Sequence, residues 1–317
     1  MVDNSIEKKK KKKRKINWSE YNESLVRRGE MLFDDGFLQN WRAELKKMNK
    51  GKDGPHYRYP NSLISLLLFA TVHAYLLPYR QLEGFLRMMS EHIKRLQEIV
   101  PDFTSIWLWR VVKMKINLDP RINPEKDDIV IVAVDSTGIN VTNRGQWILD
   151  KWKQKKRLRK GFIKIHLAVV IKTKKIVSMS VTKEDVHDGK ILKDLVDNIK
   201  NYNIKKVLAD GAYDSKDNFR FLDKMKIMPM IKVRRNSSIR NNAKCIPRKL
   251  SVILQLDDIK RWKKRHWYGM RCMVESAFSS IKRTFGEYVS FVKWNNIIND
   301  LMLKESIYNT FIDKTMT

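Results

Sequence analysis

The strongest constraint on the fold is the apolar segment IVIVAV at 129–134, which leads directly into Asp135. A short apolar run rich in β-branched residues predicts a strand that is buried on both faces of a sheet. Two further strand patterns follow at 161–171 and 175–183, and a tight turn rich in lysine joins them. This order predicts two consecutive hairpins, and therefore three neighbouring antiparallel strands.

Beyond these strands the pattern alternates between helix and strand. The expected elements are a helix at 191–201, a strand at 205–211, a helix near 215–225, a strand at 227–233 and a later helix at 268–282. We therefore expect a mixed α/β fold (α+β) with a ribonuclease-H-like core, in which 129–141 and 205–211 pair with one another.

The formal net charge of +30 in 317 residues points to a polyanionic partner. So many positive charges in one chain repel one another, and a bound nucleic acid is the first candidate for a partner that offsets this repulsion. The basic run at 8–15 predicts a disordered arm that touches phosphates, with a plain solubility tail as the alternative. Anionic lipid is the weaker candidate, because the apolar run at 63–77 contains polar residues and is too short to span a bilayer.

The expected location is the cytoplasm, in association with the nucleoid and not with a membrane. The N-terminus lacks the apolar region of a signal peptide. Cys245 and Cys272 stand alone in the sequence, so neither a disulfide framework nor a zinc site is indicated.

The first third of the chain has the pattern of an all-helical domain. Helices are expected at 19–34, 36–49, 62–77, 79–96 and 105–116, separated by capping residues and a proline. The last of these carries Arg110 and Lys113 and admits two interpretations, a helix-turn-helix or ordinary helix packing. The polar linker at 118–128 then marks a boundary. The predicted units are an arm at 1–15, a helical DNA-binding domain at 16–118 and a catalytic domain at 119–317.

Asp135 and Asp210 each follow an apolar strand pattern and precede small residues. A buried strand rarely ends in an acid unless a cation or hydrogen-bond donors satisfy it, so a metal ion is a natural partner. Taken singly, each aspartate is as well explained as a turn former. Hard oxygen ligands without a histidine or cysteine cluster favour Mg²⁺ or Mn²⁺ over zinc. Asp214, by contrast, is expected to cap the helix near 215–225.

The helix predicted at 268–282 carries a polar and an apolar stripe side by side. At about 100° per residue, an arc of roughly 60° holds Tyr268, Arg271, Glu275 and Lys282. The apolar stripe consists of Val274, Phe278, Ile281 and Phe285. Taken alone, the polar stripe is most simply a solvated face. Together with the two strand-end aspartates, however, Glu275 completes a set of three carboxylates suited to two metal ions about 4 Å apart.

These motifs resemble those of the DDE transposases of insertion sequences. The resemblance rests on VDSTG around Asp135, on LADGAYDS around Asp210, and on the spacing of the polar stripe. In the insertion-sequence groups four and five the signature is Tyr, two residues, Arg, three residues, Glu, six residues and Lys, and all four positions fit. The segments PYRQLEGFLR and DFTSIWLWRV also resemble the family's helical DNA-binding region.

The resemblance implies a transposase that cleaves the ends of its mobile element and joins the 3′-hydroxyls to target DNA by two-metal-ion phosphoryl transfer. The implied catalytic residues and ligands of two Mg²⁺ or Mn²⁺ ions are Asp135, Asp210 and Glu275. The residues expected to contact DNA are Tyr268, Arg271, Lys282, Arg110 and Lys113. The expected partners are double-stranded DNA, both as terminal inverted repeats and as target, and a second copy of the chain in a homodimeric active complex.

Two alternatives stay open from the sequence. A structure-specific nuclease would use the same metals without strand transfer, and a domesticated transposase would bind DNA without cutting it. The basic segment between Arg234 and Lys264 is expected to be either a DNA-contacting loop or a plain disordered connection. If the mechanism is right, Asp135 and Asp210 lie on neighbouring strands, with Glu275 within roughly 4 to 8 Å of both.

Overall fold

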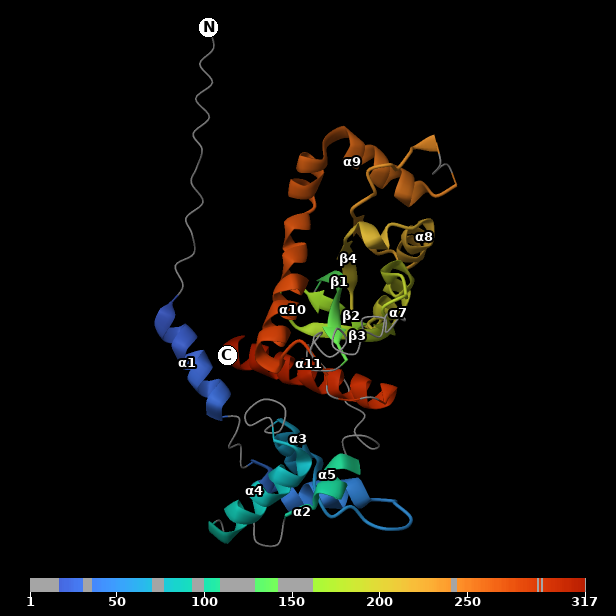
Figure 1. The fold of residues 1–317 in the computed structure, drawn as a ribbon. Coiled ribbons are helices and arrows are strands. Elements are labelled where there is room, and N and C mark those ends of the chain that lie inside the picture. Colours follow the sequence, from blue (N-terminus) through green and yellow to red (C-terminus); the bar gives the residue numbers. More distant parts are fainter. Residues whose placement is uncertain are drawn as a thin grey trace, which may run out of the picture.

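The chain folds into a helical N-terminal lobe and a larger part built on a β-sheet (Figure 1). The computed structural model describes residues 17–30, 36–69, 77–92, 100–108, 129–141, 162–240, 244–289, 291 and 293–316. The N-terminal helices are α1 (Trp18–Glu30), α2 (Gly36–Asn49), α3 (Asn61–Phe69), α4 (Tyr79–His92) and α5 (Phe103–Leu108). The described N-terminal residues are thus mainly helical, as predicted, while the expected boundaries at 15 and 118 lie outside the described residues.

The sheet contains two kinds of strand pairing. Its strands are β1 (Val130–Asn140), β2 (Phe162–Val170), β3 (Ile176–Lys183), β4 (Ile204–Ala209) and β5 (Met228–Ile231). They lie in the order β3-β2-β1-β4-β5, with β1, β2 and β3 antiparallel and β4 and β5 parallel to β1. Three antiparallel strands followed by parallel strands that return through helices form a ribonuclease-H-like core. Both the hairpin order and the pairing of β1 with β4 confirm the predictions from sequence.

Helices and short 3₁₀ turns connect and cover these strands. The α-helices of this part are α7 (Leu192–Asp197), α8 (Lys216–Lys224), α9 (Ile246–Arg265), α10 (Cys272–Phe285) and α11 (Trp294–Met316). The 3₁₀ turns are η5 (Asp188–Lys190), η6 (Gly211–Tyr213) and η8 (Tyr268–Arg271). None of the helices among the described residues is long and apolar enough to cross a membrane.

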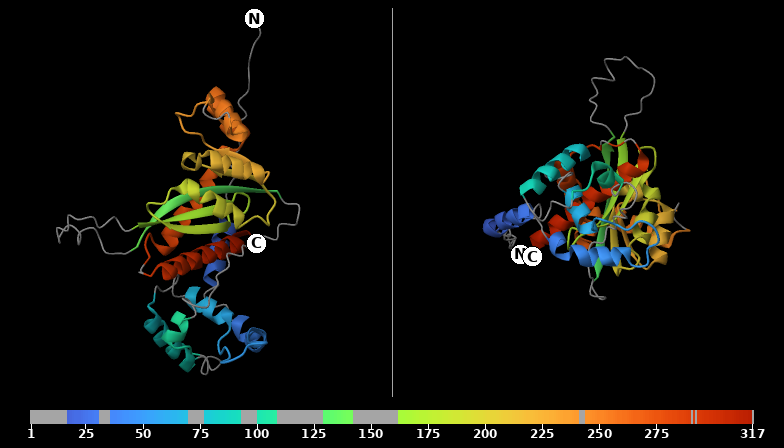
Figure 2. Two further views of the ribbon diagram at one scale, coloured as in Figure 1. Left: turned by 90° about the vertical axis from the view of Figure 1, so that its right-hand side faces the viewer. Right: turned by 90° about the horizontal axis from the view of Figure 1, so that it is seen from below.

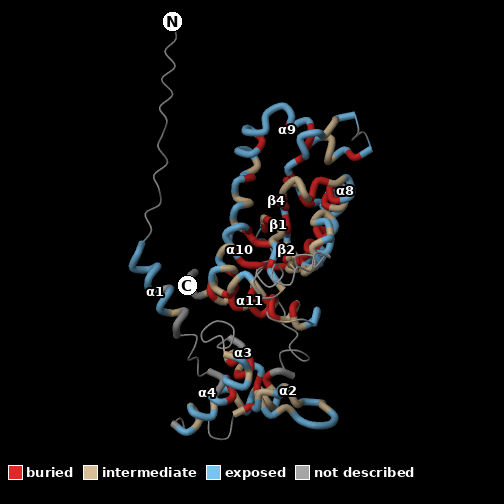
Figure 3. Tube along the Cα trace, viewed as in Figure 1, coloured by how far each residue is buried: buried red, intermediate tan, exposed pale blue. Residues whose placement is uncertain are grey.

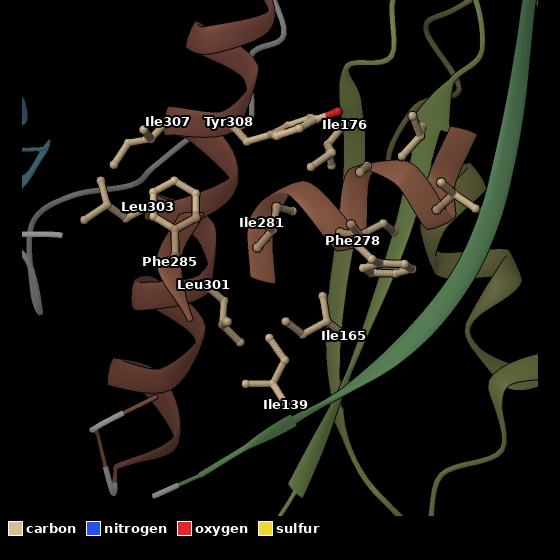
Figure 4. Packing of buried hydrophobic residues seen from close by; sticks show 14 of the residues in the cluster. Ile139, Ile165, Ile176, Phe278, Ile281, Phe285, Leu301, Leu303, Ile307 and Tyr308 are labelled. Carbon is tan, nitrogen blue, oxygen red and sulfur yellow. The ribbon is translucent and has the colours of Figure 1, made fainter. Parts of the chain in front are cut away.

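Each face of the sheet has its own hydrophobic core. Along β1, Ala133 points to one cluster while Val132 and Val134 point to the other, because successive side chains of a strand alternate between faces. The first cluster packs against α10 and α11, where Phe278 and Leu301 lie close to the strands (Figure 4). The second packs against α7 and α8. Buried residues lie on the strands and on the helices that cover them (Figure 3). Because helices cover both faces of the sheet, the strands carry apolar side chains on both faces.

At the β3 edge of the sheet, side chains of α11 bond the backbone at the start of the strand. At the start of β3, the backbone N–H of Ile176 donates to Oδ1 of Asn309 at 2.8 Å, and Nδ2 of Asn309 donates back to the carbonyl of Ile176 at 2.8 Å. The hydroxyl of Tyr308 bonds the carbonyl of Lys174 at 3.1 Å. One side-chain amide thus takes the place of a further strand at this position of the exposed edge.

Candidate active site

Asp135 and Asp210 lie at the same level on two neighbouring parallel strands, where β4 ends. Ala133 of β1 is the partner of Leu208 of β4, and each aspartate comes two residues after its member of that pair. The two strands diverge here, because the chain turns away from the sheet at Asp210 to form η6. The predicted neighbourhood of the two aspartates is therefore confirmed.

Asp135 lies within β1 and not at its end, which corrects the expectation of a strand-end acid, while the predicted strand bounds of 129–141 agree with β1. β1 continues to Asn140, and every residue from Ser136 onward has a partner on β2. Beyond Asp135, β1 pairs with β2 but no longer with β4, its neighbour on the opposite side, which has already ended. The side chain of Asp135 lies on the same face of the sheet as that of Ala133, because successive side chains of a strand alternate, and there it pairs with Arg271.

Burial and a neighbouring acid both act on Asp135. Removal from water raises the pKa of this carboxyl, and the nearby Asp210 raises it further. The backbone N–H of Ser136, which donates to Asp135 at 2.9 Å, and the guanidinium of Arg271 work in the opposite direction without reversing the shift. Asp210 accepts a bond from the backbone N–H of Ala212 at 2.8 Å. An acid pair of this kind is stabilised by any cation that enters between them.

The residues Tyr268 to Lys282 do not form one continuous α-helix, contrary to the prediction. Trp267 has a left-handed backbone (φ 57°), the following four residues form the 3₁₀ turn η8, and α10 begins only at Cys272. A 3₁₀ helix has about three residues per turn, so Tyr268 and Arg271 still project to the same side. The apolar stripe of α10 is buried as predicted, at Val274, Phe278, Ile281 and Phe285.

Arg271 joins the carboxylates of two different elements. Its Nη1 bonds and pairs with Asp135 on β1, and its Nη2 bonds and pairs with Glu275, one turn further along. The hydroxyl of the buried Tyr268 donates to the carbonyl of Ala209 at 3.0 Å, immediately before Asp210. Burial raises the pKa of Tyr268 to about 12, so this hydroxyl stays protonated and acts as a donor. η8 and α10 are thereby fixed to the middle of β1 and to the end of β4.

A groove with a basic wall runs beside these residues. The residues lining it are Lys260, Lys263, Lys264, Trp267, Tyr268, Gly269, Met270, Arg271, Cys272 and Glu275. Trp267 presents an exposed indole there, with 70% of its surface accessible. Lys282, on the third turn of α10, does not line this groove.

The lysines of this groove were missed from the sequence. The stretch between Arg234 and Lys264 was expected to be a loop or a disordered connection, whereas most of it belongs to the helix α9. The sequence signal for this wall is the basic segment at 260–265. On a helix, Lys260, Lys263 and Lys264 of this segment fall on one side and line the groove together.

A second hydrogen-bond network starts at Ser136, the residue after Asp135. The hydroxyl of Ser136 donates to Oδ2 of Asp188 at 2.9 Å, and Nζ of Lys164 donates to its Oδ1 at 3.0 Å. Burial alone would raise the pKa of Asp188, but the bonds from Lys164 and Ser136 outweigh it and the pKa is lowered. The carboxylate is therefore ionised and fixes η5 to β1 and β2. His166, buried nearby, has its pKa lowered to about 4 by burial, which agrees with a neutral structural histidine.

Asp214 does not cap the next helix, contrary to expectation. Ser215 is the N-cap of α8, and its hydroxyl accepts from the backbone N–H of Asn218 at 3.1 Å. Asp214 instead forms a bidentate pair with Arg248 of α9, with Nε to Oδ1 at 2.7 Å and Nη2 to Oδ2 at 2.8 Å. A cap and an ion-pair partner cannot be told apart from sequence, because the cation is far away in the chain.

Two predicted DNA contacts, Arg110 and Lys113, lie outside the described residues, as does the arm at 1–15. In the described part of the chain, no group of three histidine, cysteine, aspartate or glutamate residues is arranged to hold a metal ion. The donors nevertheless fit a hard divalent cation, since Asp135, Asp210 and Glu275 offer carboxylate oxygens. A guanidinium already bridges two of them, in the role of a counter-ion.

The chain is similar to known transposases. Two family models, both described as a transposase DDE domain, match the chain, one at residues 126–310 and the other at residues 26–144. Among solved structures, the chain is similar to a piggyBac transposase, determined by cryo-EM as a synaptic complex with hairpin DNA. The sequence identity is 12%, the match covers 91% of this chain and 74% of that chain, and the TM-score is 0.38.

Proposed function

The chain belongs to the transposase DDE-domain family, and from this premise we propose that it cleaves the ends of a mobile element and joins the freed 3′-hydroxyls to target DNA. We further propose that the element is an insertion sequence of the group four or five type. One observation supports the proposed DNA cleavage most directly. Asp135 and Asp210 lie side by side on two neighbouring strands where β4 ends, and Arg271 pairs with both Asp135 and Glu275.

DDE transposases generally use divalent metal ions. In this chain the proposed ligands of two Mg²⁺ or Mn²⁺ ions are Asp135, Asp210 and Glu275, which have the hard oxygen donors that these ions prefer. When bound, such ions would activate water and stabilise the leaving 3′ oxygen. The raised pKa of Asp135 supports the assignment, because a buried acid pair favours an added cation.

Arg271 has a specific part in this proposal. Without DNA it neutralises Asp135 and Glu275. A phosphate in the groove offers the guanidinium an alternative bidentate partner, and transfer of Arg271 to that phosphate would release both carboxylates. Tyr268 supports the arrangement by holding the end of β4 through its bond to Ala209. Substrate binding and exposure of the acids would thus be linked.

The proposed partner is double-stranded DNA, both as terminal inverted repeats and as target. The net charge of +30 and the lysine wall of the groove at Lys260, Lys263 and Lys264 support it. Further proposed phosphate contacts are Lys282, Arg110 and Lys113. We also propose a homodimer in the active complex, located in the cytoplasm with the nucleoid.

The test replaces each acid by its amide, in Asp135→Asn, Asp210→Asn and Glu275→Gln. Each variant should lose Mg²⁺-dependent cleavage of an end-containing duplex while retaining its affinity in a gel-shift titration. Asp223→Asn, at an exposed acid on α8, is the matched control and should cleave normally. A variant that keeps most of its activity would remove that residue from the site. Cleavage without joining of a pre-cut 3′-hydroxyl end to target would identify a nuclease instead of a transposase.

A further inference from the structure

The helix α9 consists of two pieces with different surroundings. Asp258 has non-helical backbone angles (φ −149°, ψ 97°), so the residues from Ile246 to Asp257 form a separate helix at one end of the molecule (Figures 1 and 2). One side of this helix packs inward through Ser251, Val252 and Gln255. The side-chain amide of Gln255 anchors it to the end of β5, since it accepts from the N–H of Val233 at 3.0 Å and donates to the carbonyl of Ile231 at 2.8 Å.

The opposite side of the same helix is apolar and exposed. We call it the α9 patch, and its members are Ile246, Leu250, Ile253, Leu254 and Leu256, whose exposed fractions range from 39% to 68%. At about 100° per residue, the first four fall within an arc of roughly 100°, and Leu256 borders it. Soluble proteins rarely leave a contiguous apolar stripe in water unless it meets a partner.

Two opposite charges lie along the α9 patch. Lys249 lies about one turn after Ile246 and Asp257 directly follows Leu256, so that the two charges are about 12 Å apart along the helix at 1.5 Å per residue. Among the described residues neither side chain forms an ion pair. Ile253 lies halfway between them, and Leu250 and Leu256 are spaced equally on either side of it.

This arrangement is complementary to itself. If two such helices pack antiparallel about a two-fold axis at Ile253, Lys249 of each copy faces Asp257 of the other, and Leu250 faces Leu256. A two-fold contact requires one surface to match its own copy in this way. DNA and anionic lipid fit less well, because Asp257 lies on the same arc as the apolar side chains and would repel phosphate.

We propose that the α9 patch is a two-fold contact between two copies of this chain. This deepens the proposed function, since it names the surface through which the two copies of a homodimer would meet. The patch exposes on the order of a few hundred Å² per copy, below the approximately 800 Å² per partner of a standard interface. The contact is therefore weak in isolation, with a dissociation constant in the micromolar range, and is strengthened when DNA holds both copies.

The experiment measures self-association of the full-length protein without DNA by sedimentation velocity over about 1 to 100 μM. The wild type should shift from monomer to dimer across this range, and the double variant Leu250→Glu/Leu254→Glu should stay monomeric. Met88→Glu, which places the same charge at an exposed apolar residue of α4, is the control and should dimerise normally.

Reversing the charges of Lys249 and Asp257 provides a second test. Lys249→Asp and Asp257→Lys should each raise the dissociation constant about tenfold, because each places like charges together twice in the dimer. The double variant should restore it, and such rescue also shows that the chains are folded. A wild type that stays monomeric, a dimer that survives the leucine substitutions, or reversed charges without rescue would overturn the proposal.

Two controls separate other outcomes. Binding of anionic vesicles that is lost on Leu250→Glu/Leu254→Glu, without any dimer, would overturn the proposal in favour of a lipid surface. The Asp135→Asn variant should dimerise like the wild type. Failure of the catalytic assignment and failure of the α9 contact are thus distinguishable.

Discussion

Substituting Arg248 by methionine leaves the carboxylate of Asp214 buried without its cation. The side chain of Asp214 is 0% exposed and that of Arg248 is 12% exposed, so water cannot replace the lost pair. Removing one partner of a buried ion pair costs about 3–5 kcal/mol. Asp214 keeps the bond from the backbone N–H of Arg234 at 3.0 Å, which places the expected loss near the lower end, at about 3 kcal/mol.

Urea denaturation followed by tryptophan fluorescence measures this loss, because Trp262 lies buried on α9. The matched variant is Arg248→Met/Asp214→Leu. It removes the unpaired charge together with its partner and should recover a large part of the stability lost in Arg248→Met. The reasoning is refuted if Arg248→Met costs under about 1 kcal/mol, or if the double variant is less stable than the single one.

Three further outcomes are expected. Glu305 is fully buried and finds no hydrogen-bond partner among the described residues, and burial raises its pKa. The stability of the wild type relative to Glu305→Gln should therefore fall by about 1.4 kcal/mol per pH unit from roughly pH 4.3 until the pH reaches the raised pKa of the folded protein, in denaturation curves at several pH values. A constant difference would contradict the raised pKa. Asp188→Asn should slow cleavage about 10- to 100-fold with unchanged DNA affinity, because Asp188 orients Ser136 next to Asp135. An unchanged rate would make Asp188 purely structural. Deleting residues 1–15 should make the plot of log affinity against log salt concentration shallower, by about 0.9 in the magnitude of the slope for each phosphate that the arm neutralises. An unchanged slope would identify a solubility tail.

The sheet was predictable because its signal is local. In β1 and β2 apolar residues point to both faces, and such continuous apolar runs identify buried strands without further information. The N-terminal half of α9 was not recognised for the converse reason. It buries Val252 on one side and exposes Leu254 on the other, so its apolar residues are not confined to a core-facing stripe with polar residues opposite.

For the candidate site, the sequence predicted the acids but not their partners. Asp135, Asp210 and Glu275 are proposed as metal ligands from strand patterns, from the spacing around Arg271 and from the resemblance to DDE transposases. The pairing of Arg271 with Asp135 joins residues 136 positions apart, and that of Lys164 with Asp188 crosses between elements. Such contacts depend on how the elements pack and leave no trace in the local pattern.

The closure of β3 by Asn309 has a consequence for the chain while it is being synthesised. The edge at Ile176 is translated 133 positions before the amide that closes it. Until the ribosome has added α11, this edge and the apolar side chains beneath α11 are open to other nascent chains. A premature stop codon just before position 309 would spare Asp135, Asp210 and Glu275 and still yield an aggregating product. Loss of the segment from position 309 onward would thus abolish activity even though the three acids are still present.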